Sequence, residues 1–349
     1  MARLLLLLLA INSVSQAADN LTVRRKVPAS AANLLKPVYF SADGSSCFLL
    51  ENQGRLREIS LPGMSTVTER NLNVKCSAFG RWEEGFAVYA DATQELIVLD
   101  EAFNETGRVK TPGLVGFATA PTLDFGYVIG KNQIGTVDLK KAKLLKLNTT
   151  PLLRAAARVK RTERRPAPLG FDRATCTLDG KYLVTMADHR INRFAIKRKG
   201  ALAWEESGWK VGSSGTPAGL SVGGNPHLVA APYGAGNSRN LPGHPVSPGY
   251  GTFIYDLKKL SVPKVTVTPG AYPEAMGFDE KLKLIYAQNF DVDLIVYNHG
   301  GAKLAQYELD DRNAQAKAFF THPDGGKLLV LTENSLFWCE LPKSVIAKG

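Results

Sequence analysis

One four-part unit recurs seven times along the chain and limits the folds that the chain can adopt. Its clearest copy is Ala271 to Asp310, in which four short runs of strand-forming residues are separated by tight turns. In this copy we predict one strand that ends at Phe278 and three more over 282–288, 294–297 and 304–309. Period-two alternation bounded by Gly, Asn and Asp is the pattern of strands and hairpins. The unit is therefore predicted to be a small antiparallel sheet.

The turn between the first and second strands is found in every copy, within FSADGSSCFLLEN, FGRWEEGFAVYAD, FATAPTLDFGYVIGKN, CTLDGKYLVTMAD, LSVGGNPHLVAAPYG, FDEKLKLIYAQN and THPDGGKLLVLTEN. A third strand follows each of these segments. Four-stranded units that repeat at a period of about 40 to 55 residues are typical of propellers, whose blades surround a central channel. The predicted fold class is all-β, a seven-bladed β-propeller with four-stranded antiparallel blades.

One end of the chain lacks a strand, and the other end has a strand to spare. The last copy ends after its third strand, at Leu341 and Pro342, whereas residues 21–27 form a single strand-like run before the first copy. We predict that this N-terminal run is the fourth strand of the last blade. Pairing the two ends closes the ring and leaves no long exposed edge. Residues 18–349 are then one domain.

Two motifs in the repeat carry a resemblance to a known group of proteins. Asp-Gly turns occur at 43–44, 179–180 and 324–325, and third strands contain Val-Asp-Leu at 137–139 and Tyr-Asp-Leu at 255–257. With these motifs the chain resembles seven-bladed propellers of the YVTN and WD-repeat type. No blade contains the Gly-His and Trp-Asp pair of WD repeats, so the YVTN-like assignment is preferred. The resemblance implies a fold, and the function has to be argued from a site.

The first residues have the pattern of a secretory signal peptide. Arg3 supplies the positive charge, 4–11 are apolar, and 15–17 include the small residues of a cleavage site. The apolar run is shorter than the roughly 20 residues that a membrane-spanning helix needs. We predict a signal peptide over 1–17, cleavage after Ala17, no transmembrane segment, and a secreted or periplasmic protein. An uncleaved lipid-facing anchor is the alternative.

The chain contains four cysteines, and all of them lie in strand-like apolar runs: Cys47, Cys76, Cys176 and Cys339. In such runs a thiol behaves as a small buried hydrophobe. The alternative is a disulfide between Cys47 and Cys76, which fall in consecutive copies. No cysteine pair has the spacing of a zinc site.

Two copies are longer than the others, and both additions are predicted to lie on one face of the ring. One addition, 151–168, links the third and fourth blades, and the other, 233–250, joins the second and third strands of the fifth blade. Because strand direction alternates within a blade, both kinds of connection leave the same face. We predict that this is the working face. The candidate binding residues are Arg154, Arg158, Lys160, Arg161, Arg164 and Arg165 in the first addition and Tyr233, Asn237, Arg239, Asn240, His244 and Tyr250 in the second.

The charge of the chain favours an anionic partner, because its formal net charge is +11 and a basic surface attracts negative ligands. We expect a protein or an anionic cell-envelope polymer, rather than nucleic acid, to bind a monomeric propeller. Two alternatives remain open. The basic addition is a solvated loop without a ligand, or the Gly/Pro-rich addition only covers the mouth of the channel.

No catalytic set can be named from the sequence. The histidines are scattered over different blades, which is typical of surface residues and not of a metal site. Five aspartates recur at the turn position and are predicted to stabilise turns: Asp43, Asp124, Asp179, Asp279 and Asp324. Residues 289–293 are likewise predicted to form a turn and not a calcium loop. The sequence thus favours a binding module without catalytic residues, cofactor or metal. The alternative, implied by the resemblance, is a lactonase-like hydrolase with its site at the channel mouth.

Overall fold

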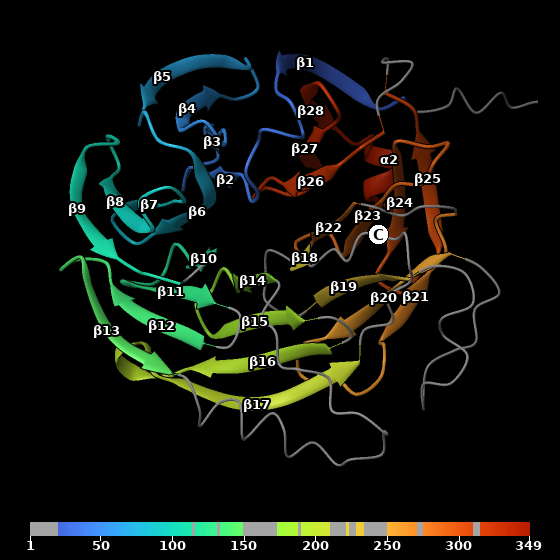
Figure 1. Cartoon of the computed structure of the whole chain (residues 1–349). Coiled ribbons are helices and arrows are strands. Elements are labelled where there is room, and N and C mark those ends of the chain that lie inside the picture. Colours follow the sequence, from blue (N-terminus) through green and yellow to red (C-terminus); the bar gives the residue numbers. More distant parts are fainter. Residues whose placement is uncertain are drawn as a thin grey trace, which may run out of the picture.

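The computed structural model describes residues 20–113, 116–130, 133–148, 173–187, 190–209, 221–222, 228–233, 250–270, 275–309 and 315–349. Seven antiparallel sheets of four strands each are arranged in a ring (Figure 1). The predicted all-β fold, a seven-bladed propeller with four-stranded blades, is confirmed.

Each blade is one sheet, numbered here in chain order. Blade 1 contains β2 (Tyr39–Phe40), β3 (Ser46–Leu50), β4 (Arg55–Ser60) and β5 (Ser65–Asn71). Blade 2 contains β6 (Cys76–Trp82), β7 (Gly85–Ala90), β8 (Glu95–Asp100) and β9 (Glu105–Lys110). Blade 3 contains β10 (Gly116–Ala118), β11 (Phe125–Gly130), β12 (Gln133–Asp138) and β13 (Lys143–Asn148). Blade 4 contains β14 (Arg173–Cys176), β15 (Tyr182–Ala187), β16 (Arg190–Ile196) and β17 (Leu202–Trp209), with the short helix η1 (Arg198–Gly200) before its last strand.

The remaining blades complete the ring. Blade 5 contains β18 (Ser221–Val222), β19 (Leu228–Tyr233), β20 (Gly251–Asp256) and β21 (Val265–Val267). Blade 6 contains β22 (Met276–Asp279), β23 (Leu284–Ala287), β24 (Leu294–Asn298) and β25 (Lys303–Tyr307). Blade 7 contains β26 (Ala318–Thr321), β27 (Lys327–Leu331) and β28 (Ser335–Glu340), and the helix α2 (Lys343–Ile346) follows it.

The fourth strand of blade 7 is the N-terminal strand β1 (Thr22–Pro28). It pairs antiparallel with β28, from Thr22 opposite Glu340 to Pro28 opposite Ser335. The predicted closure of the ring is therefore confirmed, and the first and last described strands, β1 and β28, are paired in one sheet (Figure 1).

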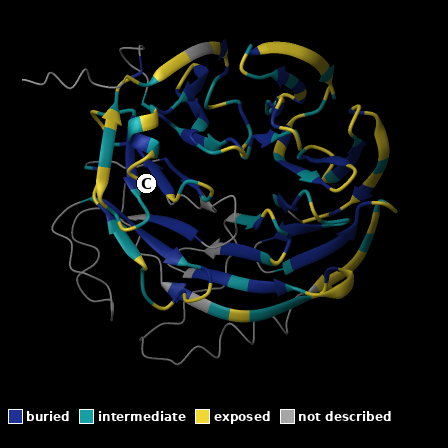
Figure 2. Cartoon of the chain, turned by 180° about the vertical axis from the view of Figure 1, so that it is seen from behind, coloured by how far each residue is buried: buried dark blue, intermediate teal, exposed yellow. Residues whose placement is uncertain are grey.

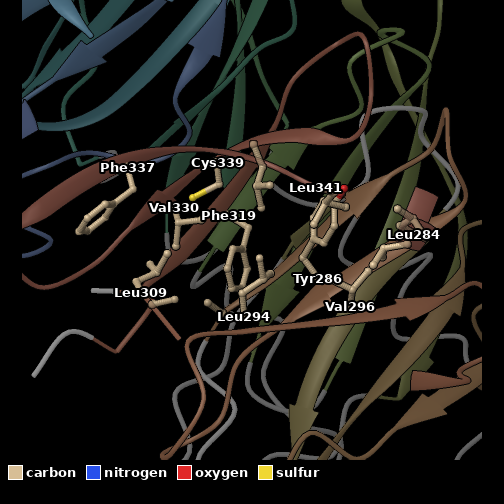
Figure 3. Packing of buried hydrophobic residues seen from close by; sticks show 14 residues of the cluster. Leu284, Tyr286, Leu294, Val296, Leu309, Phe319, Val330, Phe337, Cys339 and Leu341 are labelled. Atoms are coloured by element: carbon tan, nitrogen blue, oxygen red, sulfur yellow. The ribbon is translucent and has the colours of Figure 1, made fainter. Parts of the chain in front are cut away.

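The hydrophobic cores lie between blades. The described residues form seven clusters of buried side chains, one at each interface between neighbouring blades. At the interface of blades 6 and 7, for example, Leu284 and Tyr286 pack with Phe319 and Val330 (Figure 3). Exposed residues gather on the outermost strands and in turns (Figure 2). Burial between blades is therefore the main apolar contribution to the stability of the ring.

The predicted strand over 282–288 is longer than the strand in the structure, β23 (Leu284–Ala287), and it was predicted to alternate. The strand β23 is buried along its whole length, because each of its faces packs against a neighbouring blade. Alternation of apolar and polar residues is therefore not required there. The strand begins at Leu284, since Lys283 belongs to the preceding turn and has a φ of 55°.

All four cysteines are buried and unbridged, in β3, β6, β14 and β28. The prediction of buried thiols is confirmed, and the alternative disulfide between Cys47 and Cys76 is not formed.

Candidate functional site

Strand direction separates the connections of the propeller into two sets. Every described strand pair within a blade is antiparallel, so the second-to-third and fourth-to-first connections leave one face. We call this face the insertion face. Strand β13 ends at Asn148 and β14 begins at Arg173, whereas β19 ends at Tyr233 and β20 begins at Gly251. The strand ends that flank both additions therefore lie on the insertion face.

Most of the candidate binding residues lie outside the described residues. This holds for all six cations of 151–168 and for Asn237, Arg239, Asn240 and His244. Tyr233 is the last residue of β19, and Tyr250 is partly buried just before β20. The two tyrosines are thus placed at the base of the second addition, and the role of the set in binding stays a prediction.

A described turn on the insertion face presents an aromatic residue that the sequence analysis did not select. Phe290 lies between β23 and β24 in blade 6, and 60% of its surface is exposed. The signal was present in the sequence as an apolar residue inside an Asn-Phe-Asp turn. It was missed because a turn pattern gives no information on whether a large side chain folds back onto the protein.

A partly buried ion pair lies near the same face, at the closure of the ring. The Nη2 of Arg57 in β4 lies 2.8 Å from Oε1 of Glu51, and the Arg57 side chain is only 6% exposed. The same nitrogen lies 3.5 Å from the carbonyl oxygen of Pro28, the last residue of β1. The pair therefore joins blade 1 to the closing strand, and we assign it a structural role.

On the opposite face, hydrogen bonds join the inner ends of neighbouring blades, and we call this set the opposite-face belt. Arg81 donates to the Phe40 carbonyl, and the Glu83 N–H donates to the Leu123 carbonyl (3.0 Å). The Thr122 hydroxyl donates to the Leu178 carbonyl (3.2 Å). The Gly326 N–H donates to Asp279 Oδ2 (2.7 Å), and His322 Nε2 donates to the Gly44 carbonyl (2.9 Å). The corresponding connection of blade 5, residues 223–227 between β18 and β19, lies outside the described residues. The belt fixes neighbouring blades relative to one another.

Asp279 has a different role from the turn aspartates with which the sequence grouped it. Among the described residues, the hydrogen bonds that Asp43 and Asp179 accept come from their own turns, as predicted. The Asp279 carboxylate is buried and accepts from Leu282 N–H (2.9 Å), from the Tyr286 hydroxyl (3.0 Å) and from Gly326 N–H in the next blade. Burial, and then the negative charge of Asp279, hold the pKa of Tyr286 well above its usual value, so this hydroxyl remains a donor.

His322 corrects the expectation that the turn histidines are surface residues. Its ring is buried and makes edge-to-face contacts with Phe40 and Trp338, each with a centroid distance of 5.3 Å. Asp324 N–H donates to Nδ1 (3.1 Å), so Nε2 carries the proton that is donated to the Gly44 carbonyl. A Cβ atom at Gly44, where φ is +72°, would overlap this ring. His322 thus joins blade 7 to blade 1.

The described residues contain no grouping of three or more His, Cys, Asp or Glu side chains with the geometry to hold a metal ion. Residues 289–293 form a turn as predicted, because Asn289 Oδ1 accepts from Asp291 N–H (2.8 Å) and Val292 N–H (2.6 Å). Within the described part of the chain, no helix has the length and apolar character needed to cross a membrane.

Comparison with known proteins adds no finer assignment. No model of a known protein family matches the chain, and no curated protein matches it. The chain is therefore classified by its fold, which is an all-β, seven-bladed propeller closed by its N-terminal strand.

Proposed function

We propose that the chain is an exported, YVTN-like propeller without catalytic activity that recognises a protein or an anionic polymer through its insertion face. The observation that carries this proposal is the placement of the two additions. Their flanking strands end on one face, in blades that are close together in the ring. In repeat scaffolds, binding residues are concentrated on loops that a rigid framework positions.

The framework provides that rigidity. A hydrophobic core fills each interface between blades, and the opposite-face belt ties neighbouring blades together. Residues that bind a partner through the insertion face would therefore be attached to a scaffold that does not have to rearrange.

Charge supports an anionic partner. The segment 151–168 contains six Lys and Arg residues against Glu163 alone, and the formal net charge of the chain is +11. Attraction between exposed charges is screened by salt over a Debye length of about 10 Å at 0.1 M ionic strength. Binding through this segment should therefore weaken as the salt concentration rises.

The position of the closing strand is compatible with export. Cleavage after Ala17 would leave β1 (Thr22–Pro28) in the mature chain, so the ring retains its fourth strand in blade 7. The N-terminal sequence of the protein isolated from its source tests this part of the proposal. We expect it to begin at Ala18, and a protein that retains residues 1–17 would contradict cleavage.

The binding proposal is tested with a charge-reversed variant and a matched control. The variant carries Arg161→Glu, Arg164→Glu and Arg165→Glu in the basic addition. The control carries Lys258→Glu, Lys259→Glu and Lys281→Glu, which changes the net charge by the same amount. These three lysines are exposed and lie in connections of the opposite face.

Proteins and polymers from a source extract are captured on the parent and on both variants at low and high salt. We expect the parent and the control to retain one ligand that high salt releases, and we expect the charge-reversed variant to lose it. Equal capture by both variants would show that the basic addition does not recognise the ligand.

A further inference from the structure

We propose that β13, the outermost strand of blade 3, binds the surface of an anionic lipid bilayer. Its leucines enter the headgroup region, and its lysines meet the negative charges of the lipids. This inference goes beyond the proposed function, because it concerns the rim of the ring and not the insertion face. Binding of this kind is reversible, since it depends on a small apolar area and on exposed charges.

The first observation is a pair of exposed leucines on one strand. Leu145 and Leu147 lie on β13 at the outer margin of the ring (Figure 1), and they are 45% and 46% exposed. Among the described residues, four other large hydrophobic side chains are exposed, and no two of them share a strand. Exposed hydrophobic residues that occur singly need no explanation, whereas adjacent ones indicate a contact surface.

A bulge in the strand pairing accounts for this exposure. The pairing of β13 with β12 moves from Lys146 directly to Leu144, so Leu145 is the extra residue. A regular strand sends successive side chains to opposite sides, and a bulge breaks this alternation. Leu145, Lys146 and Leu147 are all exposed as a result. The bulge thus gathers two apolar side chains and a cation on the rim.

The second observation is the charge of the strand. Lys143 and Lys146 are exposed on β13, which contains no acidic residue. Neither lysine forms an ion pair within the part of the chain that the structure describes. The turn before the strand adds Lys140 and Lys141, which are also exposed but are paired with carboxylates of blades 2 and 3. The two cations of β13 itself are therefore available to an external anion.

The combination of leucine and lysine favours a lipid surface over a protein or a soluble polymer. Protein interfaces are depleted in lysine, and leucine is under-represented among the residues that dominate their energy. Leucines next to cations are instead typical of segments that lie in the interface of an anionic bilayer. The long lysine side chain keeps its ammonium group at the headgroups while the leucines lie deeper. A soluble polyanion would use the lysines, but it offers no apolar environment to the leucines.

Protection of a free sheet edge accounts for the lysines of β13 but not for its leucines. Lysines on an outermost strand hinder its pairing with another chain. Exposed leucines have the opposite effect, because an apolar edge favours association. The leucines therefore need an explanation of their own, and contact with lipid provides it.

The sequence that follows β13 has the same composition. The strand ends at Asn148, and the segment 151–168 contains six Lys and Arg residues together with Leu152 and Leu153. An anionic lipid surface attracts each nearby cation with a gain of about fivefold in affinity. The charge that favours binding at β13 is therefore continued along the chain.

The test measures binding of residues 18–349 to lipid vesicles by cosedimentation. This form contains every described strand of the ring, and it lacks the apolar run at 4–11, which would itself bind lipid. Vesicles of phosphatidylglycerol and phosphatidylcholine in equal parts are compared with vesicles of phosphatidylcholine alone. We expect binding to the mixed vesicles only, and we expect high salt to weaken it. Binding to neither kind of vesicle, or to both equally, would overturn the inference.

Two double variants test whether β13 makes the contact. Leu145→Ser with Leu147→Ser should weaken binding to the mixed vesicles at least about tenfold, because the apolar area that enters the bilayer is lost. Lys143→Glu with Lys146→Glu should weaken it at least about twentyfold, because each cation near the surface contributes about fivefold. The second variant changes only exposed side chains. Parent-like binding by either variant would overturn the inference.

The matched control is Val23→Ser with Val67→Ser. These valines are 39% and 59% exposed and lie on the outermost strands of blades 7 and 1. We expect the control to bind the mixed vesicles as the parent does. A loss equal to that of the leucine variant would show that exposed apolar residues act regardless of their place, and it would contradict a site on β13.

A fluorescent label tests insertion directly. The four native cysteines are buried, so a thiol-reactive nitrobenzoxadiazole reagent labels the introduced cysteine of Leu145→Cys or Val67→Cys in the folded protein. With mixed vesicles, we expect the emission of the label at position 145 to rise and to shift to shorter wavelength. The label at position 67 should not respond. Unchanged emission at position 145 would refute insertion of this strand.

Soluble heparin is the probe for a polyanion at the same strand. If the parent bound heparin but not the mixed vesicles, β13 would be assigned to a soluble polyanion and the inference would be overturned. The capture experiment with the charge-reversed basic addition is independent of this result, because the β13 variants leave the insertion face unchanged. Failure of the lipid contact is therefore distinguishable from failure of the proposed function.

Discussion

Replacing Asp279 by alanine should destabilise the propeller far more than an ordinary turn substitution does. The Asp279 carboxylate is buried at the interface of blades 6 and 7 and accepts three hydrogen bonds, from Leu282, Tyr286 and Gly326. The alanine variant leaves these three donors without their acceptor. Gly326 belongs to the neighbouring blade, so the loss also weakens the opposite-face belt.

The magnitude follows from the number and type of the lost bonds. A hydrogen bond to a charged group contributes about 1.5 to 3 kcal/mol, and the contributions of bonds that share one acceptor are not additive. We therefore expect the free energy of unfolding to fall by about 3 to 5 kcal/mol. Tyr286→Phe removes one of the three bonds and should cost about 1.5 to 2 kcal/mol.

Urea denaturation provides the measurement, with Asp179→Ala as the matched control. Asp179 accepts hydrogen bonds from Thr177 and Lys181 within its own turn, and its side chain is 27% exposed. Its loss should cost about 1 kcal/mol or less. The assignment of Asp279 as a link between blades would be refuted if both aspartate variants unfolded at the same urea concentration with an unchanged m value.

Three further predictions concern the core, the turns and the thiols. Ile285→Asp places a charge at a fully buried position and should cost at least about 4 kcal/mol; a cooperative melt near the parent temperature would contradict the burial of β23. Hydrogen bonds from the hydroxyl of Ser41, then from Ser45, hold the pKa of Asp43 at about 2, below its usual 3.8. Because the folded pKa is the lower one, the stabilisation is complete above about pH 4 and is lost as the pH falls toward 2. The stability difference between the parent and Asp43→Asn should therefore shrink over that range in urea titrations, and a constant difference would count against the turn geometry. Burial raises the pKa of the Cys47, Cys76 and Cys339 thiols to about 12. A thiol reagent at pH 8 should therefore label the native protein very slowly, and it should label all four thiols once the protein is unfolded. Rapid labelling of the native protein would contradict the buried positions of the cysteines in the strands.

Much of the fold could be predicted because short stretches of neighbouring residues specify the strands and turns of the repeat. Strand and turn patterns depend on neighbouring residues, and a turn such as Asp43-Gly44 is stabilised by groups within a few positions. Because the pattern occurs seven times, a wrongly predicted strand in one copy can be recognised by comparison with the other copies. The closing role of β1 was predicted for a different reason, namely that the last copy lacks a fourth strand.

The candidate site could be predicted less completely from sequence patterns. The two additions were found as departures from the period, and alternating strand direction placed both on one face. The exposure of Phe290 depends on how the links around Pro269 and Gln315 hold its turn, and these contacts join residues far apart in the sequence. No local pattern contains that information.

The sequence by itself determined the number of blades, the order of their strands and the location of the additions, because each of these follows from periodicity along the chain. It also determined the closure of the ring, because the last copy lacks a fourth strand and an unpaired strand precedes the first copy. Only the tertiary structure decided that Asp279 and His322 join blades, that β23 is buried on both faces, and that Phe290 points outward on a fixed turn. The physical reason is that these properties depend on the neighbouring blade. The partner of a side chain across an interface is set by how two sheets pack, and similar turns within the repeat have different partners there.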